Sequence, residues 1–258
     1  MEITKLYHYT SLDAFHKIMT GKLTFPNGKS EKDYILMHAT HIRYMNDMME
    51  YLYFQELLWE ALEGRGVSRS NFDEYMKKLD LIPKPFVISF SKKPEFLPMW
   101  QMYANNAAGI MLEFDIEKLK PKNSVLSKCI YTENICSDVD IKKCIAIIEN
   151  NSNWSAIFDN MGFREKMSYV KSPDYEQEGE WRIYKQSESV YTKMSGAMIK
   201  QYTEIDIPIE SLTGVVIGPC MPNREQVKEC IDLLVNKKNK NPELEVRFSK
   251  IKSYRNNM

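Results

Sequence analysis

Short apolar runs of strand length, interrupted by turn residues and by two helical blocks, constrain the fold of this 258-residue chain most. Residues 86–91, 109–114 and 214–218 are the clearest runs, because β-branched and aromatic residues fill them. Further strands are predicted at residues 3–9, 23–25, 34–39, 125–131, 180–185, 205–207 and 244–248. The Asn105-Asn106 turn predicts a hairpin between 86–91 and 109–114. Strands and helices do not alternate regularly, which predicts an α+β fold.

The helical blocks are expected to be insertions into a single domain that spans residues 1–258. They cover about 46–82 and about 137–168. Asp47 and Glu50 have the spacing of a capping box at the start of the first block. A chain of this length can bury most of its apolar surface around one core, so no second domain is required.

The charge balance limits the classes of function. Lysine plus arginine and aspartate plus glutamate both number 35, so no global basic field favours nucleic acid or a membrane surface. Neither a signal peptide nor an apolar window of about 20 residues is recognisable. The sequence therefore predicts a soluble, cytoplasmic protein without a membrane partner.

The cysteines are scattered and odd in number. Their spacing matches neither a zinc site nor a disulfide framework, so reduced thiols and no bound metal are expected. The five positions are Cys129, Cys136, Cys144, Cys220 and Cys230.

The most distinctive chemical feature is the pair Glu178 and Glu180 in the run Glu-Gly-Glu-Trp-Arg. In an extended segment, residues two apart point to the same face, so both carboxylates can reach one substrate. Two carboxylates in one pocket can divide the roles of charged group and proton carrier. The alternative is a solvated strand edge with two exposed charges.

Two polar patches accompany strand ends. His8, Tyr9 and Thr10 end the first predicted strand, where the histidine can donate a ring N–H to a ribose hydroxyl. Either Thr10 or Ser11 can cap the next helix. Ser89 and Ser91 place two hydroxyls on one face of a central strand, which suggests a cleft. A structural histidine and ordinary strand-end serines are the alternatives.

Isolated residues add weaker candidates. Trp100 and Tyr103 lie about one helical turn apart and are more typical of a core than of a stacking platform. Arg43 can meet a phosphate, although an isolated arginine is usually solvated.

The order of these motifs resembles a bacterial family catalogued only as a domain of unknown function. The motifs are His-Tyr-Thr, Asn-Asp-x-x-Glu, Ser-Phe-Ser, Trp-x-x-Tyr, Gly-Ile-x-Leu-x-Phe, Glu-x-Glu-Trp-Arg and Val-Ile-Gly-Pro. The resemblance extends from Leu6 to about Leu234.

A second resemblance is to the ADP-ribosyltransferase fold, which implies a split antiparallel β-core with helical insertions and NAD as substrate. By this resemblance His8 meets the NAD ribose, while Ser89 and Ser91 brace the nicotinamide pocket. Glu180 stabilises the charge of the transition state, and Glu178 orients or deprotonates the acceptor.

The same resemblance makes Tyr103 a candidate to stack on nicotinamide, and Arg182 or Arg43 a candidate for the pyrophosphate. The acceptor is a protein side chain, a nucleic acid or water, and a role in phage defence is a further hypothesis. Two alternatives stay open: a nucleotide-sensing or partner-binding module without catalysis, and a hydrolase that uses the carboxylate pair.

Overall fold

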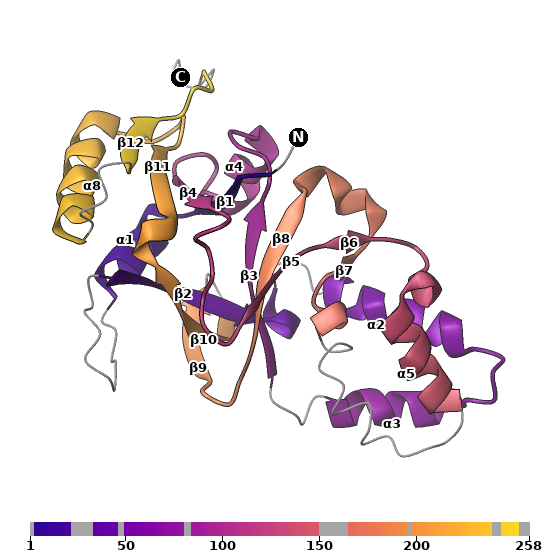
Figure 1. Ribbon diagram of the computed structural model, residues 1–258. Coiled ribbons are helices and arrows are strands. Elements are labelled where there is room, and N and C mark those ends of the chain that lie inside the picture. The colour runs from indigo at the N-terminus through magenta and orange to yellow at the C-terminus, as the bar shows by residue number, and fades with distance from the viewer. Residues whose placement is uncertain are drawn as a thin grey trace.

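A ten-stranded, largely antiparallel sheet forms the centre of the computed structural model (Figure 1). The structure describes residues 3–21, 33–45, 49–79, 84–149, 165–195, 198–238 and 244–252. The sheet contains β1 (Lys5–Thr10), β2 (Tyr34–His41), β3 (Lys84–Ser91), β4 (Ile110–Asp115), β5 (Val125–Lys128), β8 (Glu180–Ser187), β9 (Tyr191–Ser195), β10 (Met198–Pro208), β11 (Leu212–Ile217) and β12 (Glu245–Phe248). A separate parallel pair is formed by β6 (Ile130–Tyr131) and β7 (Val170–Lys171).

The strand order is β12-β11-β4-β1-β3-β2-β10-β9, with β8 beside β3 and β5 beside β8. Only β11 and β12 run parallel within this sheet. The predicted α+β class is confirmed in this sense: the sheet is largely antiparallel and helices are inserted between its strands.

The sheet is divided along one edge of β3. On its other edge β3 pairs with β8 along its whole length. On the divided edge, the described part of β3 pairs with β1 only at Tyr7↔Ser91, and with β2 only at Thr40↔Val87 and His41↔Phe86. Between these contacts, the carbonyl oxygen of Ser89 lies 2.9 Å from the ring nitrogen Nδ1 of His8. A side chain therefore takes the place of a backbone N–H as its partner. Thus β1 and β2 diverge and leave space at the middle of the sheet.

Two helices cover the larger hydrophobic core. Ser11 caps α1 (Leu12–Thr20) by accepting a hydrogen bond from the backbone N–H of Ala14 at 3.1 Å. Phe15 of α1 and Ile231 of α8 (Arg224–Lys238) are buried against the sheet. Leu6 of β1 belongs to the same buried cluster, so this apolar packing helps to position β1 and therefore His8.

The helical insertions form a second core on the other side of β3 and β8 (Figure 1). They contain α2 (Met49–Leu62), α3 (Arg69–Leu79) and α5 (Val139–Glu149). Phe54 of α2 and Phe72 of α3 are almost completely buried, and they belong to the same cluster as Val87 and Tyr184 of the sheet. This packing holds the N-terminal end of α2 next to β7 and β8.

The predicted hairpin between residues 86–91 and 109–114 is wrong. The short helix α4 (Leu97–Tyr103) intervenes, and β4 pairs with β1 and β11 rather than with β3. Asn105, Asn106 and Ala107 follow α4 with left-handed φ values of 49°, 53° and 68°. This turn ends the helix and leads the chain toward β1.

The remaining segments include four 3-10 helices, which are η2 (Ile42–Tyr44), η3 (Ile135–Ser137), η4 (Pro173–Glu178) and η5 (Ile209–Ser211). The predictions for residues 23–25 and for Asp47 fall outside the described residues, as does much of the predicted helix beyond α5. Within the described ranges, no helix is long and apolar enough to cross a membrane.

Candidate functional site

Glu178 and Glu180 reach the same site from two different local conformations. Glu178 ends η4, Gly179 adopts a left-handed conformation with φ 56° and ψ 47°, and Glu180 begins β8. The expectation that one extended segment carries both glutamates is therefore wrong. Their exposed fractions are 6% and 4%, so the alternative of a solvated strand edge also fails.

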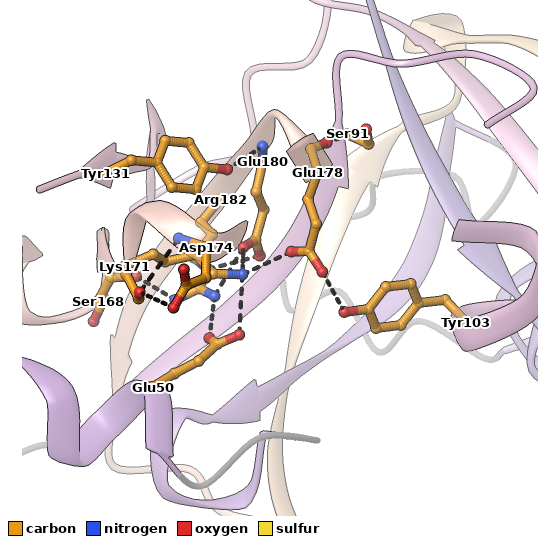
Figure 2. A network of polar contacts seen from close by, with 11 residues as sticks. Glu50, Ser91, Tyr103, Tyr131, Ser168, Lys171, Asp174, Glu178, Glu180 and Arg182 are labelled. Carbon is orange, nitrogen blue, oxygen red and sulfur yellow. Dashed lines mark hydrogen bonds and ion pairs between the residues drawn. The ribbon is translucent and has the colours of Figure 1, made fainter. Parts of the chain in front are cut away.

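Lys171 of β7 joins three carboxylates. Its ammonium nitrogen lies 2.7 Å from Glu178 Oε2, 2.7 Å from Glu180 Oε2 and 3.0 Å from Glu50 Oε1 (Figure 2). An ammonium group has three N–H donors, so each carboxylate can receive one. Lys171 is only 1% exposed, and such a buried charge requires this compensation.

Arg182 closes the network from β8. Its Nε donates to Glu180 Oε1 at 2.8 Å, and one terminal nitrogen donates to Glu180 Oε2 at 3.0 Å. The same terminal nitrogen also donates to Glu50, and the other donates to the carbonyl of Ser168 at 2.7 Å. This guanidinium is buried and paired, and it does not line the cavity where a pyrophosphate was expected.

The surrounding cations keep Glu180 ionised. Burial alone would raise the pKa of this carboxyl, but the charges of Arg182 and Lys171 outweigh burial and lower the pKa from 4.5 to about 2. Burial would lower the pKa of Lys171, but Glu180 and then Glu50 raise it above its usual value. Glu180 is therefore a carboxylate at neutral pH.

Glu178 has a different set of partners. Its Oε1 accepts a hydrogen bond from the Tyr103 hydroxyl at 3.1 Å, and its Oε2 accepts one from Lys171 (Figure 2). Burial, followed by the charge of Glu178, raises the pKa of Tyr103, so its phenol stays protonated. Glu178 is thus compensated by one cation and one neutral donor, whereas Glu180 contacts two cations.

His8 faces the division in the sheet with a defined tautomer. Its Nδ1 lies 2.9 Å from the Ser89 carbonyl oxygen, and a carbonyl can only accept, so Nδ1 carries the proton. Burial lowers the pKa of His8, as does the charge of Lys193, so the ring is neutral at neutral pH. The resulting Nε2 is a hydrogen-bond acceptor, in contrast to the donor role predicted for this histidine.

A cavity of about 670 Å³ brings most of the predicted site residues together. Its wall includes His8, Tyr9, Thr10, Ser89, Ser91, Tyr103, Glu178 and Glu180. Arg43 lies on η2, is exposed and is not part of this wall. The volume falls within the range of about 300–1,000 Å³ that is typical of small-molecule sites.

Two of these residues have structural hydrogen bonds that fix the wall. The Ser91 hydroxyl donates to the Glu178 carbonyl at 2.6 Å and accepts from the Lys93 N–H at 3.0 Å. The Tyr9 hydroxyl donates to the Lys93 carbonyl at 2.9 Å and accepts from the Phe96 N–H at 3.1 Å. Both side chains therefore position the cavity wall through backbone groups.

Several site residues were not identified from the sequence. They are Glu50 and Lys171 of the network, Tyr131, and His38, Lys193 and Lys200 on β2, β9 and β10. Tyr131 receives a hydrogen bond of 2.8 Å from the backbone N–H of Glu180. Glu50 was predicted only as a capping residue, and Lys171 was not singled out from the sequence.

The described cysteines Cys129, Cys136, Cys220 and Cys230 are free thiols. Burial raises the pKa of the Cys129 thiol, which disfavours the reactive thiolate. Among the residues that the structure describes, no group of three or more histidine, cysteine, aspartate or glutamate residues could hold a metal ion.

Comparison with known proteins identifies one segment. Residues 99–183 match the family model described as "Protein of unknown function (DUF2971)". No match was found among curated proteins or among solved structures. The matched segment contains Tyr103, Lys171, Glu178, Glu180 and Arg182, so it carries most of the buried network. The predicted resemblance to a family of unknown function is thus confirmed, and residues 99–183 of this chain are similar to DUF2971.

Proposed function

We propose that the protein binds NAD in the cavity and breaks the bond between its ribose C1′ and its nicotinamide nitrogen. This is the reaction of ADP-ribosyltransferases and NAD glycohydrolases. The observation that carries the proposal is the buried network of three carboxylates and two cations at the cavity wall. The divided antiparallel sheet gives further support, because the cavity wall includes residues on both sides of the division.

The charge of the network suits this chemistry. Glu50, Glu178 and Glu180 face Lys171 and Arg182, which leaves one net negative charge in the cluster. Cleavage of a glycosidic bond develops positive charge at C1′ and the ring oxygen. A fixed negative charge in a water-poor site stabilises such a transition state, and one well-placed group contributes about 3–4 kcal/mol.

The protonation state of Glu180 also indicates which kind of leaving group the site favours. Glu180, with a pKa of about 2, cannot donate a proton at neutral pH. Nicotinamide needs none, because the bonding electron pair passes to its positively charged ring nitrogen and it leaves as a neutral molecule. This argument favours NAD over the ordinary glycosides that a carboxylate-pair hydrolase would cleave with the help of a general acid.

The hydrogen-bond partners of Glu178 and Glu180 indicate different roles for the two carboxylates. Glu178 is the less compensated carboxylate, so it faces the developing charge and accepts the proton of the attacking water or acceptor hydroxyl. The oxygen of that group bonds to C1′, and the proton then passes to solvent. Glu180 is a positioning residue that holds Lys171 and Arg182. His8 Nε2 accepts a hydrogen bond from a ribose hydroxyl.

The decisive experiment follows nicotinamide release from NAD by chromatography, with cell extract as a source of acceptor. We expect Glu178→Gln to reduce release at least 100-fold, about 2.7 kcal/mol on the transition state, without unfolding the protein. Glu225→Gln is the matched control, because the Glu225 side chain is 68% exposed on α8. Release that is equal in the wild type and in Glu178→Gln would contradict the proposal.

A nucleotide-sensing module without catalysis is the second candidate. It is favoured because Glu180 is already fully engaged with the protein: its two oxygens accept three hydrogen bonds from Lys171 and Arg182. Calorimetry separates the two functions: binding of NAD without any nicotinamide release would support the sensing module. Absence of both binding and release would exclude both functions.

A further inference from the structure

Two lysines face each other across the hairpin of β9 and β10. Lys193 and Lys200 are direct cross-strand partners, so their side chains leave the same face of the hairpin. Tyr191 and Tyr202 form the next partner pair on that face. Like charges directly opposite each other destabilise a sheet, so this arrangement has a cost in the free protein.

Burial increases that cost. Lys200 is 8% exposed, and Lys193 is partly buried with its ammonium 5.2 Å from the centre of the Tyr202 ring. Burial, then Lys200 and Lys17, lower the pKa of Lys193 to about 8. Within the described ranges, no carboxylate lies within ion-pair distance of Lys193, and Lys17 is paired with Asp13 on its own helix.

The neighbouring His38 does not compensate the positive charge of the two lysines. Its ring lies 4.1 Å from the Tyr202 ring, and Glu204 is its direct partner on β10. Burial, then Lys193 and Lys17, lower the pKa of His38 to about 4, so the ring is neutral at neutral pH. His38 can therefore donate or accept a hydrogen bond beside the two ammonium groups.

These residues belong to the same cavity as the acidic network. Lys17, His38, Lys193 and Lys200 line its wall together with Glu178 and Glu180. The wall therefore has a basic part and an acidic part. A ligand that complements both must carry negative charge in one portion and hydroxyl groups or positive charge in another.

We propose that Lys193 and Lys200 bind the phosphate groups of a nucleotide, and that this basic part selects a nucleoside diphosphate ester as the ligand. The inference deepens the proposed function, on which the choice of a nucleotide rests. Lysine binds phosphate as a compact point charge, and an anion between the two ammonium groups removes their repulsion. His38 supplies a neutral hydrogen bond to the same phosphate.

The test uses ADP, which has phosphates but no nicotinamide-ribose bond, in calorimetry with the full-length protein. We expect ADP to bind the wild type, and Lys193→Met and Lys200→Met each to raise the Kd about tenfold or more. Lys228→Met, which alters an i,i+4 pair on α8, should leave the Kd unchanged. Inorganic pyrophosphate should compete with ADP.

Thermal unfolding without ligand provides a readout independent of binding. Removal of one ammonium from the pair should raise the Tm of Lys193→Met above that of the wild type, because methionine keeps the apolar stem and ends the repulsion. A lower Kd or an unchanged Kd for ADP in both lysine variants would overturn the anion site. No binding of either compound to the wild type would overturn it too, and pyrophosphate binding without ADP binding would overturn the selection of a nucleotide.

The outcomes also separate this inference from the proposed function. If ADP binding depends on the lysines but NAD is never cleaved, the anion site stands and the cleavage proposal fails. If NAD is cleaved with the same KM in both lysine variants, the cleavage proposal stands and the anion site fails.

Discussion

At the scale of single residues, the three carboxylates around Lys171 differ in the positive charges that they contact. Oε1 of Glu180 accepts from Arg182 and its Oε2 accepts from both Arg182 and Lys171, whereas Glu178 accepts from one cation and one phenol. Removing one partner of a buried pair leaves the opposite charge without compensation, which costs more than the pair itself contributes. Loss of Glu180 should therefore affect folding most, and loss of Glu178 should affect chemistry most.

We predict that Glu180→Gln lowers the free energy of unfolding by about 3–5 kcal/mol, and that Glu178→Gln lowers it by clearly less. The measurement is urea denaturation followed by circular dichroism at neutral pH. Equal losses in the two variants would contradict the different compensation of the two carboxylates.

The same pair of proteins gives a pH prediction. The pKa of Glu180 is lower in the folded state, about 2, than its ordinary 4.5, so its contribution is complete above about 4.5 and lost as the pH falls toward 2. The difference in unfolding free energy between wild type and Glu180→Gln should therefore shrink on acidification from pH 5 to pH 2. A constant difference would show that Glu180 is not ionised in the folded protein at low pH.

At the residue scale, the sequence predicted that Glu178 and Glu180 lie close together, and in the structure both carboxylates contact Lys171. Their proximity follows from their separation of two residues. The contact of Lys171 with Glu50 has no such basis, because the two residues meet only after the chain has folded. Long-range ion pairs of this kind cannot be read from local patterns.

At the scale of elements, the turn from η4 into β8 determines where Glu178 points. Gly179 has a φ of 56°, and a Cβ there would lie 2.8 Å from the side chain of Lys92. Side chains other than glycine are strained in this backbone conformation. Glycine is therefore favoured at position 179 for two reasons: the backbone conformation of the turn and the space that the Lys92 side chain occupies.

We predict that Gly179→Ala destabilises the protein by about 1–2 kcal/mol and also reduces nicotinamide release. Gly66→Ala is the matched control, because Gly66 has a φ of 80° but no atom within 4 Å of the added Cβ. The control should lose stability without loss of activity. Equal activity in both variants would show that the turn does not position Glu178.

Elements were predictable where a local pattern was strong. The apolar runs of β3, β4 and β11 identified their positions, and Ser11 identified the start of α1. The pairing of β4 with β1 was not predictable, because the helix and left-handed turn after β3 change the direction of the chain. The hairpin of β9 and β10 was only partly recognised, because its lysines and exposed side chains lack a clear strand pattern.

At the scale of the whole molecule, the cysteines are distributed over separate parts of the structure. Cys129 is buried, Cys230 is exposed on α8, and none of the described cysteines forms a disulfide. We predict that thiol titration of the denatured protein without reductant counts all five. A lower count, or zinc released in stoichiometric amount, would contradict the expectation of reduced, metal-free thiols.

The helical insertion that begins with α2 influences the electric field of the cavity. Glu50 comes from the first turn of α2, and it supplies one of the three carboxylates that outnumber Lys171 and Arg182. Without Glu50 the cluster would be neutral. The potential that a bound molecule experiences therefore depends on how closely α2 docks against β7 and β8, because this helix carries Glu50 into the cavity wall.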